Sequence, residues 1–190
     1  APVIERLRRA HPGLRLRVLL GDRKVDLVRD GVDLALRIGF PKESSLILRR
    51  LAQTDEILVA APSLVGTGAS LKDLSALPRV AHSLVDAPSW SLTHLDGRTE
   101  SVTWPPSVVA VDSSDLVRRL VVRGLGWSVL PELLVTDALR SGALVRVAPE
   151  WAWRRVDVFA LMPSRAVSPP RRAVLAALED RLAEIMEDAA

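Results

Sequence analysis

Along the first forty positions, apolar residues recur with two different periods, one typical of helices and one typical of strands. Residues 3–10 repeat apolar side chains at helical spacing, and His11-Pro12-Gly13 ends that pattern. Residues 14–18 alternate leucine or valine with arginine, which predicts a half-buried strand. A short helix over 22–31 and a strand over 32–38 follow. Because helices and strands take turns, the pattern predicts a parallel sheet with right-handed crossovers.

The rest of the chain continues this alternation. Ser70, Asp112-Ser113-Ser114 and Ser168 are typical helix starts, and Pro131 and Pro169 stand at first helical positions. Asp96-Gly97 predicts a hairpin between residues 90 and 104, and this dipeptide favours a type I′ turn. Strands are predicted over residues 56–61, 80–81, 108–111, 127–130, 144–147 and 156–162. The fold class is therefore α/β.

The composition excludes several kinds of functional site. The 190 residues contain no cysteine, which excludes disulfides, thiolate metal sites and cysteine nucleophiles. The formal charge is only +3, and the arginines occur in short scattered pairs, so we interpret them as solvated helix faces and surface ion pairs rather than a phosphate-binding patch. No apolar run approaches the ~20 residues of a membrane span, so we expect no membrane partner.

A search for catalytic and cofactor motifs is negative. There is no phosphate-binding Walker loop, and the histidines are far apart in sequence. Gly124-Leu125-Gly126 lacks the third glycine of a dinucleotide fingerprint and ends a helix instead of beginning one. We therefore expect no enzyme activity, no metal and no cofactor.

Three positions suggest a site for a small molecule, and each has a plainer interpretation. Gly39-Phe40 ends a strand where open α/β sheets bind ligands, although Gly39 also suits a simple turn. His82-Ser83 follows a buried strand, where His82 can equally be structural. Asp112-Ser113 begins a helix, whose free N–H groups attract anions while the Asp112 carboxylate repels them. Trp127 either lines a pocket or belongs to the core.

Several segments in order resemble the regulatory domain of LysR-type transcriptional regulators. The resemblance begins with Pro12-Gly13-Leu14-Arg15-Leu16 and continues through 21–28 and 31–39. It returns at Ser45–Pro62, at 124–131 (GLGWSVLP), at 142–147 (GALVRV) and at Ser168-Pro169. Any one segment is a weak signal, but order and spacing match over nearly the whole chain.

The resemblance implies a two-lobed fold like that of type II periplasmic binding proteins, with two crossing strands and a ligand between the lobes. Lobe I would comprise 1–62 and 165–190, and lobe II 63–164. The crossings would lie near 61–64 and 162–165. The family's first strand, with a loop that usually contributes to the effector site, is missing from this sequence, so lobe I and the site are expected to be incomplete.

The resemblance also assigns ligand-contacting positions one at a time. Trp127 departs from the small aliphatic residue usual at its position, which would make the pocket smaller or more aromatic. The full set is Arg37, Ile38, Gly39, Phe40, His82, Ser83, Asp112, Ser113, Trp127 and Val129.

Family membership further implies partners. The domain is expected to form a homodimer or tetramer, with the helix over 3–10 of one copy against the helix over 114–123 of the other, although their apolar stripes can also be core alone. DNA binding would belong to a winged helix-turn-helix that this sequence does not include, and the protein would be cytoplasmic. The alternatives are a transport-type solute-binding protein of the same fold, and a transferase or dehydratase on that fold.

Overall fold

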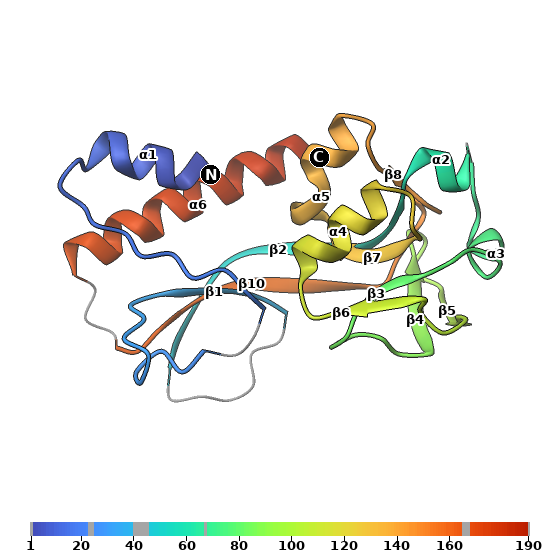
Figure 1. Cartoon of the computed structure of the whole chain (residues 1–190), viewed down its shortest axis with the longest axis horizontal. Coiled ribbons are helices and arrows are strands. Elements are labelled where there is room, and N and C mark those ends of the chain that lie inside the picture. Colours follow the sequence, from blue (N-terminus) through green and yellow to red (C-terminus); the bar gives the residue numbers. More distant parts are fainter. Residues whose placement is uncertain (1, 23–24, 40–45, 67, 165–167, 190) are drawn as a thin grey trace. The chain divides into compact units, whose positions relative to one another are not determined.

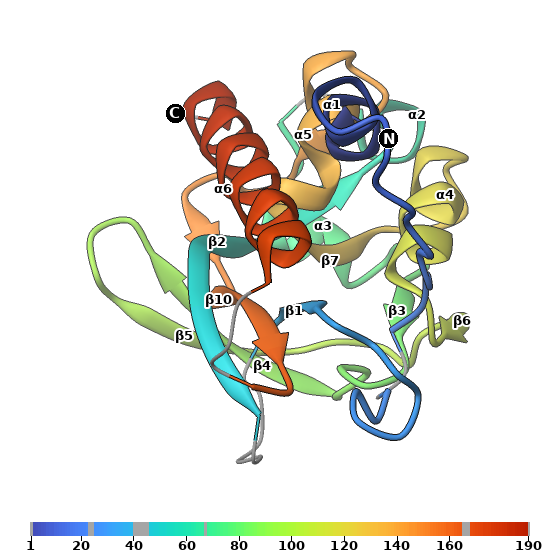
Figure 2. The same cartoon turned by 90° about the vertical axis from the view of Figure 1, so that its left-hand side faces the viewer.

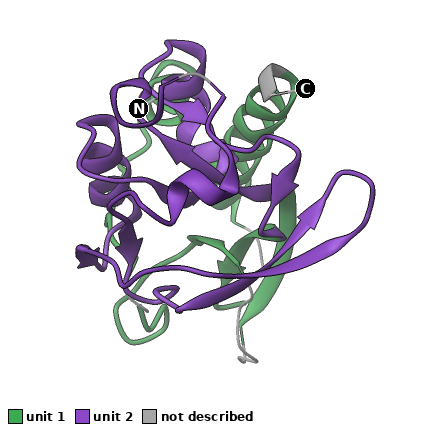
Figure 3. Ribbon diagram, turned by 90° about the vertical axis from the view of Figure 1, so that its right-hand side faces the viewer, with its two compact units in different colours: residues 1–53, 156–190 green, residues 54–155 purple. Residues whose placement is uncertain are grey.

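The computed structural model describes residues 2–22, 25–39, 46–66, 68–164 and 168–189. The chain divides into two compact units, shown in green and purple in Figure 3. Unit 1 comprises residues 1–53 and 156–190, and unit 2 comprises residues 54–155. Strand β2 (Ile47–Ala60) and strand β10 (Arg154–Met162) each continue from one unit into the other, so the chain crosses twice.

Unit 1 contains two helices and parts of three strands, which lie in the order β1, β10 and β2. Helix α1 (Pro2–Ala10) lies beside helix α6 (Pro169–Ala189) in both views of Figures 1 and 2. Leu7 is the buried residue of α1, and Arg6 forms ion pairs with Asp180 and Glu184 of α6. Strand β1 (Ala35–Ile38) pairs antiparallel with β10. Helix α6 begins at the proline that the sequence indicated.

Two expected elements of unit 1 are absent, and the parallel sheet expected there is not formed by its described residues. Residues 14–20 form no strand, although their apolar and charged side chains alternate as a strand would require. Instead of a helix over 22–31, residues 27–31 form turns, and the Asp26 carboxylate accepts hydrogen bonds from the backbone N–H groups of Val28 and Arg29. An aspartate that satisfies local N–H groups in this way favours a turn over a helix.

Unit 2 contains the remaining elements. The second half of β2 pairs antiparallel with β7 (Ser128–Pro131) and β8 (Val145–Arg146). Strands β3 (Val80–His82) and β6 (Val109–Val111) pair in parallel. The helices are α2 (Pro62–Val65), α3 (Leu71–Leu74), α4 (Ser114–Val122) and α5 (Glu132–Arg140). Helix α3 begins with the expected Ser70, which forms a capping box with Asp73.

The expected hairpin is present, but its turn differs from the expected type. Strands β4 (Ser89–His94) and β5 (Thr99–Thr103) pair antiparallel, and β9 (Trp151–Ala152) pairs with β4. Gly97 has a φ of 89°, whereas Asp96 is not among the residues with positive φ, so the turn is not type I′. The Asp96 carboxylate accepts the N–H of Arg98, which stabilises a wider loop.

Candidate functional site

The carboxyl ends of β3 and β6 lie side by side in unit 2. His82 is the register partner of Val111, and the backbone N–H of Ser83 donates to the carbonyl of Val111 at 2.8 Å. The Ser83 hydroxyl donates to the same carbonyl at 3.3 Å. His82 Nδ1 accepts from the N–H of Leu84 at 3.2 Å. These contacts place two polar side chains at one edge of a parallel strand pair, where α/β sheets bind ligands.

Helix α4 begins directly after β6 at the same edge. Its N-cap is Ser113, as expected, and the Ser113 hydroxyl accepts the N–H of Leu116 at 3.4 Å. The helix leaves backbone N–H groups and the positive end of its dipole at its start, which suits an anionic or hydroxyl-bearing group of a ligand. The exposed carboxylate of Asp112 opposes a full negative charge there.

Two arginines of α4 form ion pairs with Asp115 in the first turn of the same helix. Hydrogen bonding from Arg118, together with the nearby charges of Arg119 and Arg118, lowers the pKa of Asp115 below its ordinary value. The Asp115 carboxylate lies 2.8 Å from Arg118 and 2.7 Å from Arg119. Asp115 is thus ionised at neutral pH and already paired with two arginines.

Two glycines hold α4 against the strands. Gly124 ends the helix with a φ of 74°, a conformation that other residues rarely adopt. Gly126 allows a close approach, because a Cβ there would lie 2.7 Å from the carbonyl oxygen of Pro78. The GLG segment noted in the sequence therefore serves packing.

Trp127 and Val129 lie in the core of unit 2. The Trp127 side chain is fully buried, and its indole N–H donates to the carbonyl of Leu74 at 3.0 Å. Its ring meets those of Trp104 and Trp90 edge to face, with centroids 4.8 and 6.1 Å apart. Val129 is 5% exposed and belongs to the same cluster. Of the two interpretations of Trp127 left open by the sequence, the described structure has the packed one.

The remaining candidate residues belong to unit 1, at the end of β1. Arg37 donates to the backbone carbonyl of Asp22 at 3.0 Å. Ile38 is partly buried. Gly39 has a φ of 104°, and its N–H donates to the carbonyl of Asp157 at 2.9 Å, so this glycine is needed for the turn. Phe40 lies outside the described residues.

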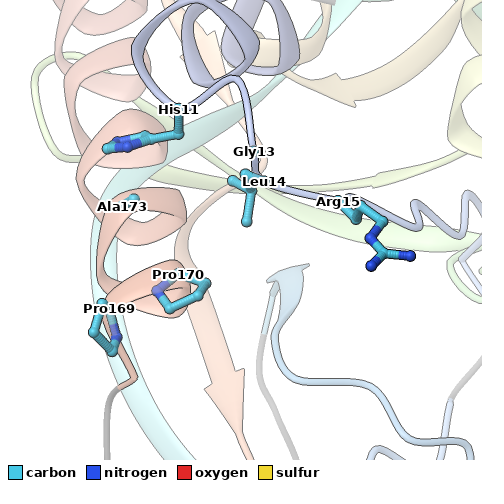
Figure 4. Close-up of a pocket in the computed structure, with 7 residues that line it drawn as sticks. All are labelled: His11, Gly13, Leu14, Arg15, Pro169, Pro170 and Ala173. Carbon is cyan, nitrogen blue, oxygen red and sulfur yellow. The ribbon is translucent and has the colours of Figure 1, made fainter.

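An open hollow of about 530 Å³ in unit 1 was not anticipated from the sequence (Figure 4). It lies where the turn after α1 meets the start of α6. Its lining residues are His11, Gly13, Leu14, Arg15, Pro169, Pro170 and Ala173. The alternation of Leu14 and Arg15 in the sequence predicts a half-buried strand and gives no sign of a hollow.

The described residues lack two further kinds of feature. They contain no group of three or more histidine, aspartate or glutamate side chains placed to hold a metal ion. None of the helices in the described part of the chain is both long and apolar enough to cross a membrane.

Comparison with known proteins identifies relatives of this chain. The family model described as the LysR substrate binding domain matches residues 1–183. The transcriptional regulator PtxR of Pseudomonas aeruginosa is 33% identical over 178 residues, covering 92% of this chain and 57% of that protein. DmlR of Escherichia coli K12 is 36% identical over 171 residues, covering 87% and 54%. The chain thus spans a little over half the length of these relatives.

Solved structures agree on the fold. The regulatory domain of CrgA from Neisseria meningitidis, a LysR-type transcriptional regulator, has a TM-score of 0.79 at 22% identity and covers 95% of this chain and 90% of its own. The effector domain of AmpR from Pseudomonas aeruginosa has a TM-score of 0.78 at 19% identity, covering 100% and 91%. The fold is therefore the periplasmic-binding-protein-like α/β fold that the family resemblance implied. Since the family model matches nearly the whole sequence, this chain belongs to the LysR substrate-binding domain family.

Proposed function

We propose that this chain is the effector-sensing and dimer-forming part of a LysR-type transcriptional regulator. The observation that carries the proposal is the match of the substrate-binding domain model to residues 1–183. The relatives that match at more than 30% identity are described as transcriptional regulators, which favours this function over transport of a solute. DNA binding is proposed for a region of the protein beyond this chain, and we propose a cytoplasmic location and no catalytic activity.

The proposed effector site is centred on the strand ends of unit 2. The hydroxyl groups of Ser83 and Ser113 and the imidazole of His82 lie at this edge beside the start of α4, and together they suit a small polar or anionic molecule. Trp127 and Val129 are buried in the core of unit 2, so we propose for them an indirect role, through packing. On the resemblance alone, we propose Arg37 to Phe40 as the contribution of unit 1, and lobe boundaries at 62 and 165.

Ligand screening by thermal shift tests this proposal. A panel of small aliphatic and aromatic carboxylates is added to the purified chain, and we expect at least one to raise the melting temperature in a saturable way, because a ligand that binds only the folded state stabilises it. Ser83→Ala should reduce the shift caused by that compound. Ser91→Ala, an exposed serine on β4, is the matched control and should leave it unchanged.

The result that contradicts the proposed sensor is a panel in which no compound shifts the melting temperature, for this chain and for the full-length regulator. A shift that Ser83→Ala and Ser91→Ala both leave intact would keep the sensor but remove this strand edge from the site.

Dimer formation is proposed through α1 and α4. Each presents an exposed apolar side chain, Ile4 at 41% and Leu116 at 42% exposure. Leu116→Glu should shift the chain toward monomer in sedimentation velocity, since a buried unpaired carboxylate is costly in an interface. Leu95→Glu, at the exposed tip of the hairpin, is the control. Equal sedimentation of the two variants would contradict an interface on α4.

A further inference from the structure

We propose that Asp86 is a positioning residue of the effector site and acts through the buried side chain of Arg79. This inference rests on the function proposed above, because it takes the strand edge at Ser83 as part of the effector site. Asp86 itself need not touch the ligand. Its ion pair with Arg79 fixes the end of segment 83–86, which follows β3 and begins with Ser83.

Arg79 is a fixed point at the other end of β3. Its side chain is only 2% exposed, although it carries a charge, and the guanidinium lies 5.4 Å from the ring centroid of Trp90. Nε donates to the carbonyl of Pro105 at 3.2 Å, and the backbone carbonyl of Arg79 accepts the N–H of Val108 at 2.8 Å. Because the side chain is packed in the core of unit 2, Arg79 cannot move without disturbing that core.

A buried charge of this kind needs a partner, and Asp86 supplies it. Nη2 of Arg79 donates to one oxygen of the Asp86 carboxylate at 2.7 Å, and the hydroxyl of Ser107 donates to the other oxygen at 2.7 Å. Nη1 of Arg79 is buried without an acceptor among the described residues. Loss of the carboxylate would leave the guanidinium charge buried and uncompensated, which is costly. The observed position of Asp86 is therefore strongly favoured.

Segment 83–86 is held at its first residue as well as at its last. The N–H of Ser83 donates to the carbonyl of Val111 at 2.8 Å, which connects the segment to the end of β6. The N–H of Val85 donates to the carbonyl of His82 at 2.9 Å. A short segment that is fixed at both ends has few conformations to lose when a ligand binds, so less binding free energy is lost to ordering it.

The segment presents two different groups to a ligand. The hydroxyl of Ser83 is a polar group at the strand edge, and the side chain of Leu84 next to it is 78% exposed. A short aliphatic carboxylate matches both, since it has a polar end for the edge beside α4 and an apolar body for Leu84.

Hydrogen exchange of the chain without ligand tests whether the ion pair holds the segment. Asp86→Asn keeps the shape of the side chain and removes its charge. We expect the amides of Leu84 and Val85 to exchange about tenfold faster, because local opening becomes easier, while that of Val117 in α4 keeps its rate. Ser107→Ala leaves the ion pair intact and should accelerate the same two amides only about twofold.

Asp137→Asn on α5 is the matched control, because the Asp137 carboxylate is 84% exposed and its contact with Arg140 is long, at 3.8 Å. This variant should change none of the exchange rates. Unchanged rates in Asp86→Asn would show that the segment keeps its shape without the ion pair and would overturn the inference. An equal acceleration at Val117 would show a general loss of stability in unit 2 and would overturn it too.

Binding of isovalerate tests the role of Asp86 at the site. In a ¹⁵N–¹H NMR titration we expect saturable shifts centred on the amides of Ser83 and Leu84. Asp86→Asn should weaken binding about fivefold, whereas Asp137→Asn should not change it. Equal affinity in Asp86→Asn and the unmodified chain would overturn the positioning role, whatever the exchange rates. An unmodified chain that does not bind isovalerate would also overturn the inference, whereas the sensor function itself fails only if the wider panel described above shifts no melting temperature.

Discussion

Unit 2 and unit 1 bury their apolar residues very differently. Unit 2 has two clusters of buried side chains, and all five tryptophans of the chain lie in this unit. Four of them, at positions 90, 104, 127 and 153, are linked by ring contacts with centroids between 4.8 and 6.1 Å. Aromatic pairs at such distances add stability beyond the area that they bury. Unit 2 therefore has the packing of a self-supporting domain.

Unit 1 buries fewer apolar side chains than unit 2. Its buried cluster consists of Ala160, Met162 and Leu175, with three partly buried neighbours. Leu20 is 94% exposed and Val28 71%, so apolar side chains face solvent where a core would be expected. Surface ion pairs of α6, such as Arg49 with Glu179 at 2.6 Å, connect its elements. Pairs of this kind contribute little when exposed, typically below about 1 kcal/mol.

The difference in packing affects how easily each unit unfolds locally. Regions with few buried apolar contacts unfold locally at lower free energy than densely packed ones. We therefore expect unit 1 to open more readily than unit 2, and the four predictions below test that ranking from the largest effect to the smallest.

Removing the central tryptophan of unit 2 should have the largest effect. Trp127→Ala deletes a fully buried ring and removes the indole's hydrogen bond to the carbonyl of Leu74, so we expect a loss of about 3–5 kcal/mol in the free energy of unfolding. Urea denaturation followed by far-UV circular dichroism measures it. Trp153→Ala, which removes a partly buried ring stacked on Trp90, should cost clearly less. Equal losses would show that Trp127 is not the centre of this core.

The matching change in unit 1 is Leu175→Ala on α6. Leu175 is 2% exposed, and its truncation should cost about 2–4 kcal/mol, since a small cluster has few neighbours to fill the gap. Hydrogen exchange should show faster exchange throughout unit 1 while the amides of β7 and α4 keep their protection. Ala176→Ser on the exposed face of α6 is the control. Uniform loss of protection in both units would mean that they unfold together and would contradict the ranking.

Loss of the α4 cap tests a local feature of unit 2. Ser113→Ala removes the side-chain acceptor for the N–H of Leu116 and should cost about 1 kcal/mol. Ser113→Asn retains an acceptor at the cap and should restore most of that stability. Thermal unfolding of the three proteins gives the comparison. If asparagine is as destabilising as alanine, the hydroxyl of Ser113 has another role than capping.

The sequence predicted those elements whose signals are local. The cap at Ser113, the capping box at Ser70 and the proline start of α6 depend only on neighbouring residues, and all three are present. The strand pattern over 14–18 failed for the opposite reason: a strand exists only if another strand pairs with it, and alternation of Leu14 and Arg15 does not provide that partner.

The features of the candidate site also divide into those that local sequence signals indicate and those that depend on the fold. The edge formed by His82 and Ser113 followed from parallel strand ends and a helix start, which a sequence can indicate. The burial of Trp127 did not follow, because a large aromatic after a glycine packs equally well in a core or beside a pocket. The hollow near Arg15 depends on α1 and α6, which are more than 150 residues apart in sequence and meet only in the fold.

The smallest effect expected is a pH dependence at the contact between α1 and α6 in unit 1. Hydrogen bonds from Arg6 and then Arg181 lower the pKa of Glu184 below its ordinary value of 4.5. A carboxyl group whose pKa is lowered by folding stabilises the folded state above its ordinary pKa, and this contribution is lost as the pH falls through the lowered value. Arg6→Gln should therefore raise the pKa of Glu184, measured by carboxyl ¹³C NMR. It should also destabilise unit 1 slightly at neutral pH, with the difference from the unmodified chain vanishing below the lowered pKa. Arg9→Gln changes an exposed arginine of the same helix and should leave the titration of Glu184 unchanged. If Arg9→Gln shifts that titration as much as Arg6→Gln does, the overall charge and not this ion pair sets the pKa of Glu184. Unit 1 would then have one specific stabilising contact fewer, and the contrast with unit 2 would be larger.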